Sequence, residues 1–148
     1  MTLTVGATDT TATNQVTDTG DVTIASHTGV LNLTSAGEAA NSIDALSAAG
    51  TTTLNIGGTF GLTQSGAATV TALTGLNVTA DAAAISLGTL TSDALINASI
   101  VASGAEANDI TITDLALDHI QTLTVTASDG ADVTLTDVNM QGDTILDA

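Results

Sequence analysis

A short apolar element recurs along the chain with a period of about 23 residues, and this period constrains the fold more than any other feature. The element alternates apolar and polar residues, as in Leu31-Asn32-Leu33 and Leu54-Asn55-Ile56. Its copies begin at nearly constant intervals, at Leu31, Leu54, Leu76, Ile100, Leu123 and Ile145. Alternation indicates a β-strand, and a fixed period in this range is typical of a solenoid in which each repeat forms one coil.

Two further apolar positions share this period. One begins a second element and gives the series Phe60, Ile85, Ile110 and Val133. The other gives the series Leu73, Leu95, Leu117 and Met140. An earlier stretch, 37–43, resembles 104–110, which predicts that Ile43 belongs to the second element. We therefore expect three short strands in each coil, with three ladders of inward side chains along the stack.

These patterns predict an all-β protein, a parallel β-solenoid (β-helix) of about 23 residues per coil and roughly five to six coils. The solenoid repeats are expected over residues 28–148, and residues 1–27 are expected to form an N-terminal cap or an irregular coil. The chain contains no Pro, which fits a fold in which nearly every backbone N–H bonds to the next coil. An antiparallel β-sandwich is the alternative fold, because many short strands separated by turns also indicate that architecture.

The composition excludes several classes of function. The chain has no Lys and no Arg against 16 Asp and Glu, for a formal net charge of −16. Nucleic-acid binding depends on cationic side chains, so we expect no nucleic-acid partner. There is no Cys for thiol chemistry or disulfides. No apolar run is long enough for membrane insertion, and the N-terminus has no classical signal peptide.

Aspartates gather at the expected corners between strands. Stacked coils should place Asp109 near Asp132, and Asp114 near Asp137, about 4.8 Å apart; Asp129 lies in the same corner as Asp132. Carboxylates this close repel one another, and Ca²⁺ prefers such hard oxygen ligands. We therefore take these five aspartates as candidate Ca²⁺ ligands, with a merely solvated acidic corner as the alternative.

No pattern indicates catalysis, and we expect that the chain is not an enzyme. Paired carboxylates can hydrolyse glycosides, but this chain has one aromatic residue, Phe60, and no cation to hold a sugar. His119 is either a metal ligand or an exposed turn residue. Threonine pairs such as Thr111-Ile112-Thr113 resemble those of ice-binding solenoids, which remain a more distant alternative.

The run 123–137, and the similar run 100–115, resemble the Thr/Ala/Asp-rich β-solenoid segments of bacterial surface-layer (S-layer) proteins and of large secreted RTX-type adhesins. The nonapeptide calcium repeat of the RTX proteins is absent, so the resemblance carries over no calcium ligand. It implies an extracellular, non-enzymatic scaffold that associates with itself and leaves the cell without a cleaved N-terminal signal.

We therefore expect an extracellular or cell-surface structural protein that self-assembles into a surface layer or a fibre, with cations promoting assembly. Its partner is another copy of the same chain, because the open strand edges at the ends of a solenoid are templates for pairing. The alternative is a spacer or binding segment of a large secreted adhesin, which stays monomeric and has a cell-surface glycan as its candidate ligand.

Overall fold

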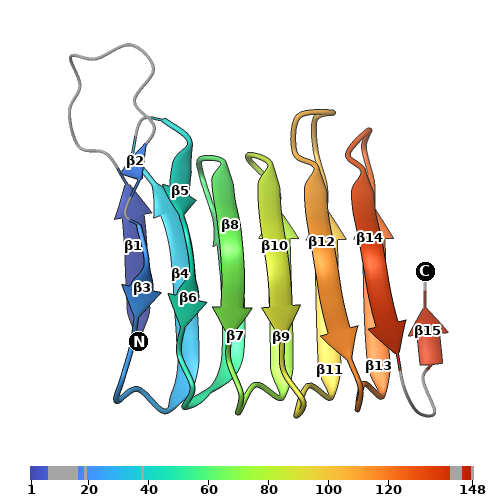
Figure 1. Cartoon of the computed structure of the whole chain (residues 1–148). Helices are drawn as coiled ribbons and strands as arrows, with labels where there is room; N and C mark the ends of the chain where they lie inside the picture. Colours follow the sequence, from blue (N-terminus) through green and yellow to red (C-terminus); the bar gives the residue numbers. More distant parts are fainter. Residues whose placement is uncertain (7–16, 19, 38, 141–144, 148) are drawn as a thin grey trace.

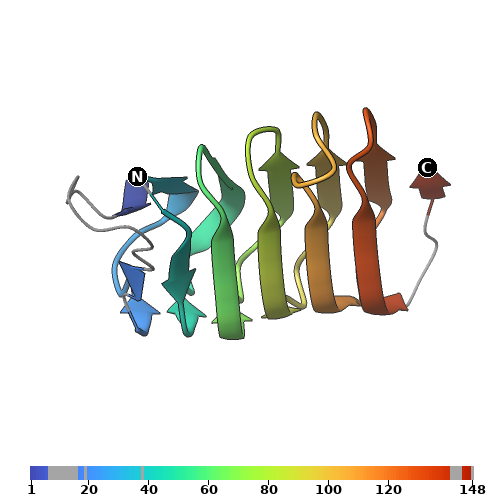
Figure 2. The ribbon, with the colours of Figure 1, turned by 90° about the horizontal axis from the view of Figure 1, so that it is seen from above.

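The computed structural model describes residues 1–6, 17–18, 20–37, 39–140 and 145–147. Over these residues the chain is all-β and winds into a β-solenoid of about five turns with coils of about 23 residues (Figures 1 and 2). Neighbouring strands pair in parallel throughout the described part. The predicted parallel solenoid is confirmed, and the antiparallel sandwich is wrong.

One wall of the solenoid is a seven-stranded sheet in the order β1-β4-β7-β9-β11-β13-β15. Each coil adds one strand to this sheet, next to the strand of the coil before it. Its strands are β1 (Thr2–Gly6), β4 (Gly29–Ala36), β7 (Thr51–Gly58), β9 (Gly75–Ala80), β11 (Asn97–Ala102), β13 (Thr122–Ala127) and β15 (Ile145–Asp147).

The opposite wall is an eight-stranded sheet, in which β2 and β3 share one row and β5 and β6 share the next. Its strands are β2 (Thr17–Asp18), β3 (Val22–Thr23), β5 (Asn41–Ile43), β6 (Leu46–Ser47), β8 (Leu62–Thr69), β10 (Ile85–Thr91), β12 (Ile110–Leu117) and β14 (Val133–Met140). Ile43 belongs to this sheet, as predicted.

The N-terminal segment extends both sheets. β1 pairs with β4 over five residue pairs, and β2 and β3 pair with β5 and β6. The boundary that we expect between residues 27 and 28 stays a prediction.

Each coil contributes strands to two sheets, so the expectation of three walls is wrong. In the first two coils that the structure describes, the second sheet receives two short strands per coil, β2 with β3 and β5 with β6. In β12 the second and third expected elements lie in one strand, in which Ile112 and Leu115 are both buried and the two residues between them are not. This break in the alternation makes one strand look like two in the sequence. Leu73 and Leu95 are buried in the turns that follow the eight-stranded sheet.

The residues that stack differ in part from the predicted ladders. In the seven-stranded sheet Leu31, Leu54, Leu76 and Leu123 lie in one row as predicted, but Ala98 takes the place of Ile100 and Leu146 that of Ile145. Ile100 instead stacks between Val78 and Val125, and Ile145 pairs with Thr122. A small inward Ala therefore occupies a position where the sequence pattern favoured the larger Ile.

The other two ladders need similar corrections. Leu62, not Phe60, pairs with Ile85, and the row continues through Ile110 and Val133. In the third series Leu117 does pair with Met140. Leu117 does not continue the row of Leu95, because Thr91 pairs with Ala116 and the strand then ends; the buried residue in the matching turn is Ile120.

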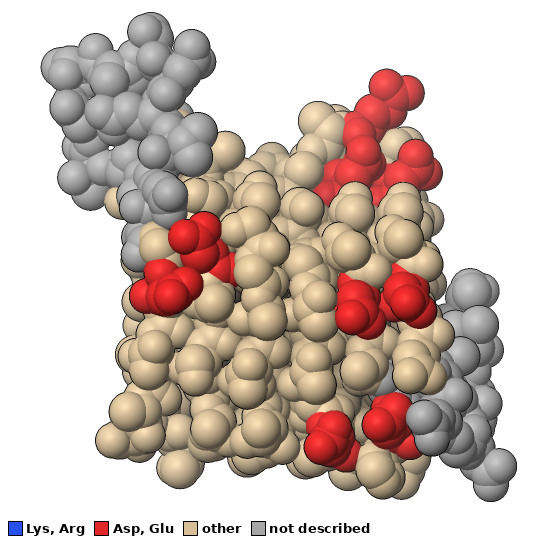
Figure 3. All heavy atoms as spheres, in the orientation of Figure 1, with Lys and Arg blue, Asp and Glu red and all other residues tan. Residues whose placement is uncertain are grey.

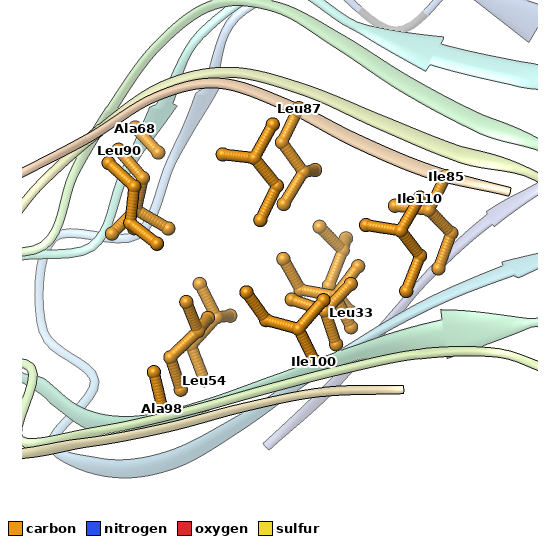
Figure 4. Close-up of a cluster of buried hydrophobic side chains, with 14 of the residues drawn as sticks. Leu33, Leu54, Ala68, Ile85, Leu87, Leu90, Ala98, Ile100 and Ile110 are labelled. Carbon is orange, nitrogen blue, oxygen red and sulfur yellow. The ribbon is translucent and has the colours of Figure 1, made fainter. Parts of the chain in front are cut away.

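The hydrophobic core lies between the two sheets and runs the length of the solenoid. Figure 4 shows Leu33, Leu54 and Ile100 from one sheet pointing toward Leu87 and Leu90 from the other. Most of these side chains are fully buried. Because each coil covers the apolar face of its neighbours, the core is stable only as a stack.

Among the described residues no helix is long and apolar enough to cross a membrane.

Candidate functional site: acidic corners, neutral face and strand edges

The structure places two pairs of the candidate aspartates side by side. Asp114 in β12 is the direct partner of Asp137 in β14. Asp109 and Asp132 precede the same two strands, and the Asp132 backbone N–H donates to Asp109 Oδ1 at 2.9 Å. Figure 3 shows the acidic side chains in separate groups on the face that carries the eight-stranded sheet in front.

The Asp109 carboxylate links two neighbouring coils through a hydrogen bond to the backbone. It accepts a backbone N–H from the next coil, and Asp21 accepts the Ala45 N–H at 3.2 Å in the same manner near the other end of the solenoid. Such a bond satisfies a backbone donor where the chain enters a new strand. One lone pair of each carboxylate is therefore already used within the protein.

Asp129 belongs to a turn and is exposed. Its φ is +59° and that of Gly130 is +94°, a conformation that Asp tolerates better than most residues. Its neighbour Ser128 donates to Asp129 Oδ2 at 3.3 Å. Among the described residues, no hydrogen bond joins Asp129 to the other candidate aspartates.

These acidic groups form pairs rather than a cage. Ca²⁺ takes six to eight oxygen ligands, and no group of three or more His, Asp or Glu side chains converges in the part of the chain that the structure describes. Four of the five aspartates thus offer two neighbouring carboxylates at each of two places, and Asp129 belongs to neither pair. Calcium binding there stays a prediction.

The two histidines lie in turns of different coils. His27 Nε2 is 2.8 Å from the Val30 carbonyl oxygen, which accepts the ring N–H. His119 is exposed after β12. Within the described residues neither belongs to a group of three or more His, Asp or Glu side chains that could hold a metal ion.

The outer face of the seven-stranded sheet differs from the rest of the surface because it is uncharged. Among the residues that the structure describes, Asp147 in β15 is the only acidic residue in a strand of this sheet. The outward positions from β4 to β13 are Thr, Asn, Ser, Gly, Ala and Val. We call this surface the neutral face.

An asparagine ladder runs along the middle of the neutral face. Asn77 Nδ2 donates to Asn55 Oδ1 at 2.8 Å, and Asn55 Nδ2 donates to Asn32 Oδ1 at 2.7 Å. The ladder ends with Asn32 Nδ2 at 3.4 Å from Thr2 Oγ1. The sequence did contain this signal, since Asn stands between two apolar residues in three successive repeats.

A third feature is found at the two ends of the stack. In the described part β14 pairs with β12 alone, and β1 pairs with β4 alone. The apolar side chains beside these edges are only partly buried: Leu3, Val22 and Ile24 at one end, and Val125, Val133, Leu135 and Val138 at the other.

Comparison with family models, curated proteins and solved structures finds no match for this chain.

Proposed function

We propose that the chain is an extracellular structural protein that self-assembles end to end into a fibre or a surface layer. The observation that carries this proposal is the pair of strand edges, β14 at one end and β1 at the other, each flanked by partly buried apolar side chains. Unpaired strand edges are templates for another chain. A head-to-tail contact between copies generates filaments.

A second copy can continue both sheets if its first coil takes the place of β15. The seven-stranded sheet has one row more than the eight-stranded sheet, because β15 extends beyond β14. β15 pairs with β13 over three residue pairs, whereas β1 offers five in its pairing with β4. If β1 of the second copy pairs with β13, its β2 and β3 lie beside β14. Each sheet of the first copy then continues into the matching sheet of the second.

The net charge opposes this contact in pure water. Copies that each carry −16 repel one another, and added salt or divalent cations screen that repulsion. The proposed assembly is therefore promoted by cations, whether or not the paired aspartates bind Ca²⁺ specifically.

A charge placed at the exposed end of the core tests the proposal. Leu135→Glu adds a carboxylate to the apolar end at β14, and Thr134→Glu adds the same charge on the outer face of the same strand as a control. Electron microscopy and analytical ultracentrifugation with 0.5 M NaCl or 10 mM CaCl₂ should show filaments for the unchanged chain and for the control. Leu135→Glu should prevent them.

Two outcomes contradict the proposal. If the unchanged chain stays monomeric in both salts, the spacer function in a large adhesin, in which such edges carry further coils of one chain, is favoured instead. If Leu135→Glu assembles as well as the control, the ends of the core are not the contact.

A chain shortened to residues 1–140 adds a second measurement. It lacks β15 and should form filaments at a lower protein concentration, because nothing then competes for β13.

A further inference from the structure

We propose that the neutral face is a second, lateral interface, through which two copies of the chain pair face to face. This contact uses the outer surface of the seven-stranded sheet and none of the strand edges. It therefore goes beyond end-to-end assembly and holds or fails independently of it.

The distribution of charge selects this face. The strands of the eight-stranded sheet carry outward Asp114 and Asp137, and the turns carry most of the remaining acidic residues. Two copies that meet through those surfaces bring carboxylates together without any Lys or Arg to pair with them. The strands β4, β7, β9, β11 and β13 contain no Asp or Glu. Contact through them avoids that repulsion.

The asparagine ladder lowers the cost of removing water from the face. A polar group that is buried without a partner is costly, but Asn32, Asn55 and Asn77 already bond to one another along the sheet. Each amide therefore needs fewer new partners when a second copy covers it. Val30, 46% exposed, and Val101 add apolar area on either side of the ladder.

The size of the face suits a weak dimer. Its strands pair in parallel from β4 to β13, and a two-fold axis can set one such sheet against another. Five strands at ~4.8 Å and about six residues at ~3.3 Å cover roughly 480 Å², or about 1,000 Å² over two copies. This is at the lower limit for a specific interface, so we expect dissociation constants of roughly 0.1 to 1 mM.

Acidic turns border the neutral face and set the salt dependence. Asp81, Glu106 and Asp129 lie in the turns at one border, and Asp93 and Asp118 in those at the other. In a face-to-face pair these borders approach one another, so salt should strengthen pairing by screening them.

The test compares two exposed threonines on opposite walls. Thr79 lies in β9 on the neutral face, and Thr63 lies in β8 on the eight-stranded sheet. Each is replaced by Asp in a chain that also carries Leu135→Glu, which blocks the ends. Neither threonine belongs to the asparagine ladder, and circular dichroism checks that both variants fold.

Sedimentation equilibrium at 0.05 to 1 mM protein in 0.5 M NaCl measures pairing. The Leu135→Glu chain should form dimers that do not grow further. Thr79→Asp should raise the dissociation constant at least tenfold because it sets like charges against each other across the pair, and Thr63→Asp should change it less than twofold.

The proposal is overturned if the Leu135→Glu chain is monomeric at 1 mM in 0.5 M NaCl, or if the two Asp variants shift the dimer equally. It is also overturned if the chain stays monomeric but Thr79→Asp abolishes thermal hysteresis or glycan binding, since the neutral face would then hold ice or a carbohydrate. Filament formation by the unchanged chain is measured separately, so failure of lateral pairing leaves the end-to-end proposal intact.

Discussion

Replacing Gly88 by Ala should destabilise the solenoid more than its small size suggests. Gly88 lies in β10 between Leu87 and Thr89, where the pairing with β8 shifts register. A Cβ at this position would lie 2.6 Å from the Gly66 carbonyl oxygen and 3.1 Å from that of Ser65. Both contacts are with backbone of β8, which cannot turn aside as a flexible side chain would.

The size of the effect follows from the movement required. Ordinary contact begins at 3.4 Å, so β10 must move away from β8 by roughly 0.8 Å, enough to stretch ladder bonds of ~2.9 Å beyond hydrogen-bonding distance. Losing two or three such bonds, at about 1 kcal/mol each, lowers the free energy of unfolding by about 2–3 kcal/mol. The melting temperature should fall by roughly 5–10 °C in a domain of this size.

Urea and thermal unfolding followed by circular dichroism measure this change, with Gly75→Ala as the control. A Cβ at Gly75 meets only the Thr53 side chain, at 3.6 Å. Ala there removes the excess freedom of Gly in the unfolded chain and should stabilise the fold by about 0.5–1 kcal/mol. A Gly88→Ala protein destabilised by less than about 0.5 kcal/mol, the range of an ordinary surface substitution, would refute the close approach of the two strands at Gly88.

Three further changes test the core, the corners and the charge. Leu54→Ala leaves a cavity in the middle of a fully buried row and should cost about 2–5 kcal/mol in urea unfolding; a loss below about 1 kcal/mol would contradict the stacking of the row. Asp109→Ala removes the acceptor of the Asp132 N–H and should cost about 0.5–1.5 kcal/mol, whereas Asp109→Asn, which keeps an acceptor oxygen, should restore most of it. If Asp114 and Asp137 hold Ca²⁺, 5 mM CaCl₂ should raise the melting temperature above that in NaCl of equal ionic strength, and EDTA or the double Asn variant should abolish the difference. Equal melting temperatures in the two salts would leave these carboxylates as a solvated pair.

The period of the sequence was sufficient to predict the solenoid, because every coil repeats the same alternation of inward and outward residues. It did not suffice for the number of strands per coil. In β12 two successive outward residues, Thr113 and Asp114, separate the buried Ile112 from the buried Leu115. The period-two pattern breaks at these two residues, although strand β12 continues through them.

Which residues stack on one another in successive coils depends partly on small residues, and these contribute little to the hydrophobic pattern of the sequence. Ala98 points inward between Leu76 and Leu123, but the larger Ile100 nearby is the more conspicuous apolar residue in the sequence. For the same reason the sequence pattern favours the large Phe60 as the start of the second series, although Leu62 is the residue that stacks on Ile85.

On the surface, residues of the same type spaced one coil apart along the sequence predicted which side chains lie next to each other. The adjacency of Asp114 and Asp137 follows from their spacing of one coil along the sequence, and the structure pairs them. The asparagine ladder follows the same rule. The neutral face was not foreseen because it is defined by the absence of charge from one wall, which becomes apparent only when the strands are sorted into sheets.

The distance along the chain between paired strands has a consequence for how the protein folds. Partners lie one coil apart, as with Leu54 and Leu76 or Ile85 and Ile110, so every new strand needs only the matching strand of the coil before it. The entropic cost of closing such a loop is nearly the same for each coil. A chain that leaves a ribosome or a narrow export channel can therefore fold coil by coil as it emerges, each finished coil serving as the template for the next, without waiting for the remainder of the sequence.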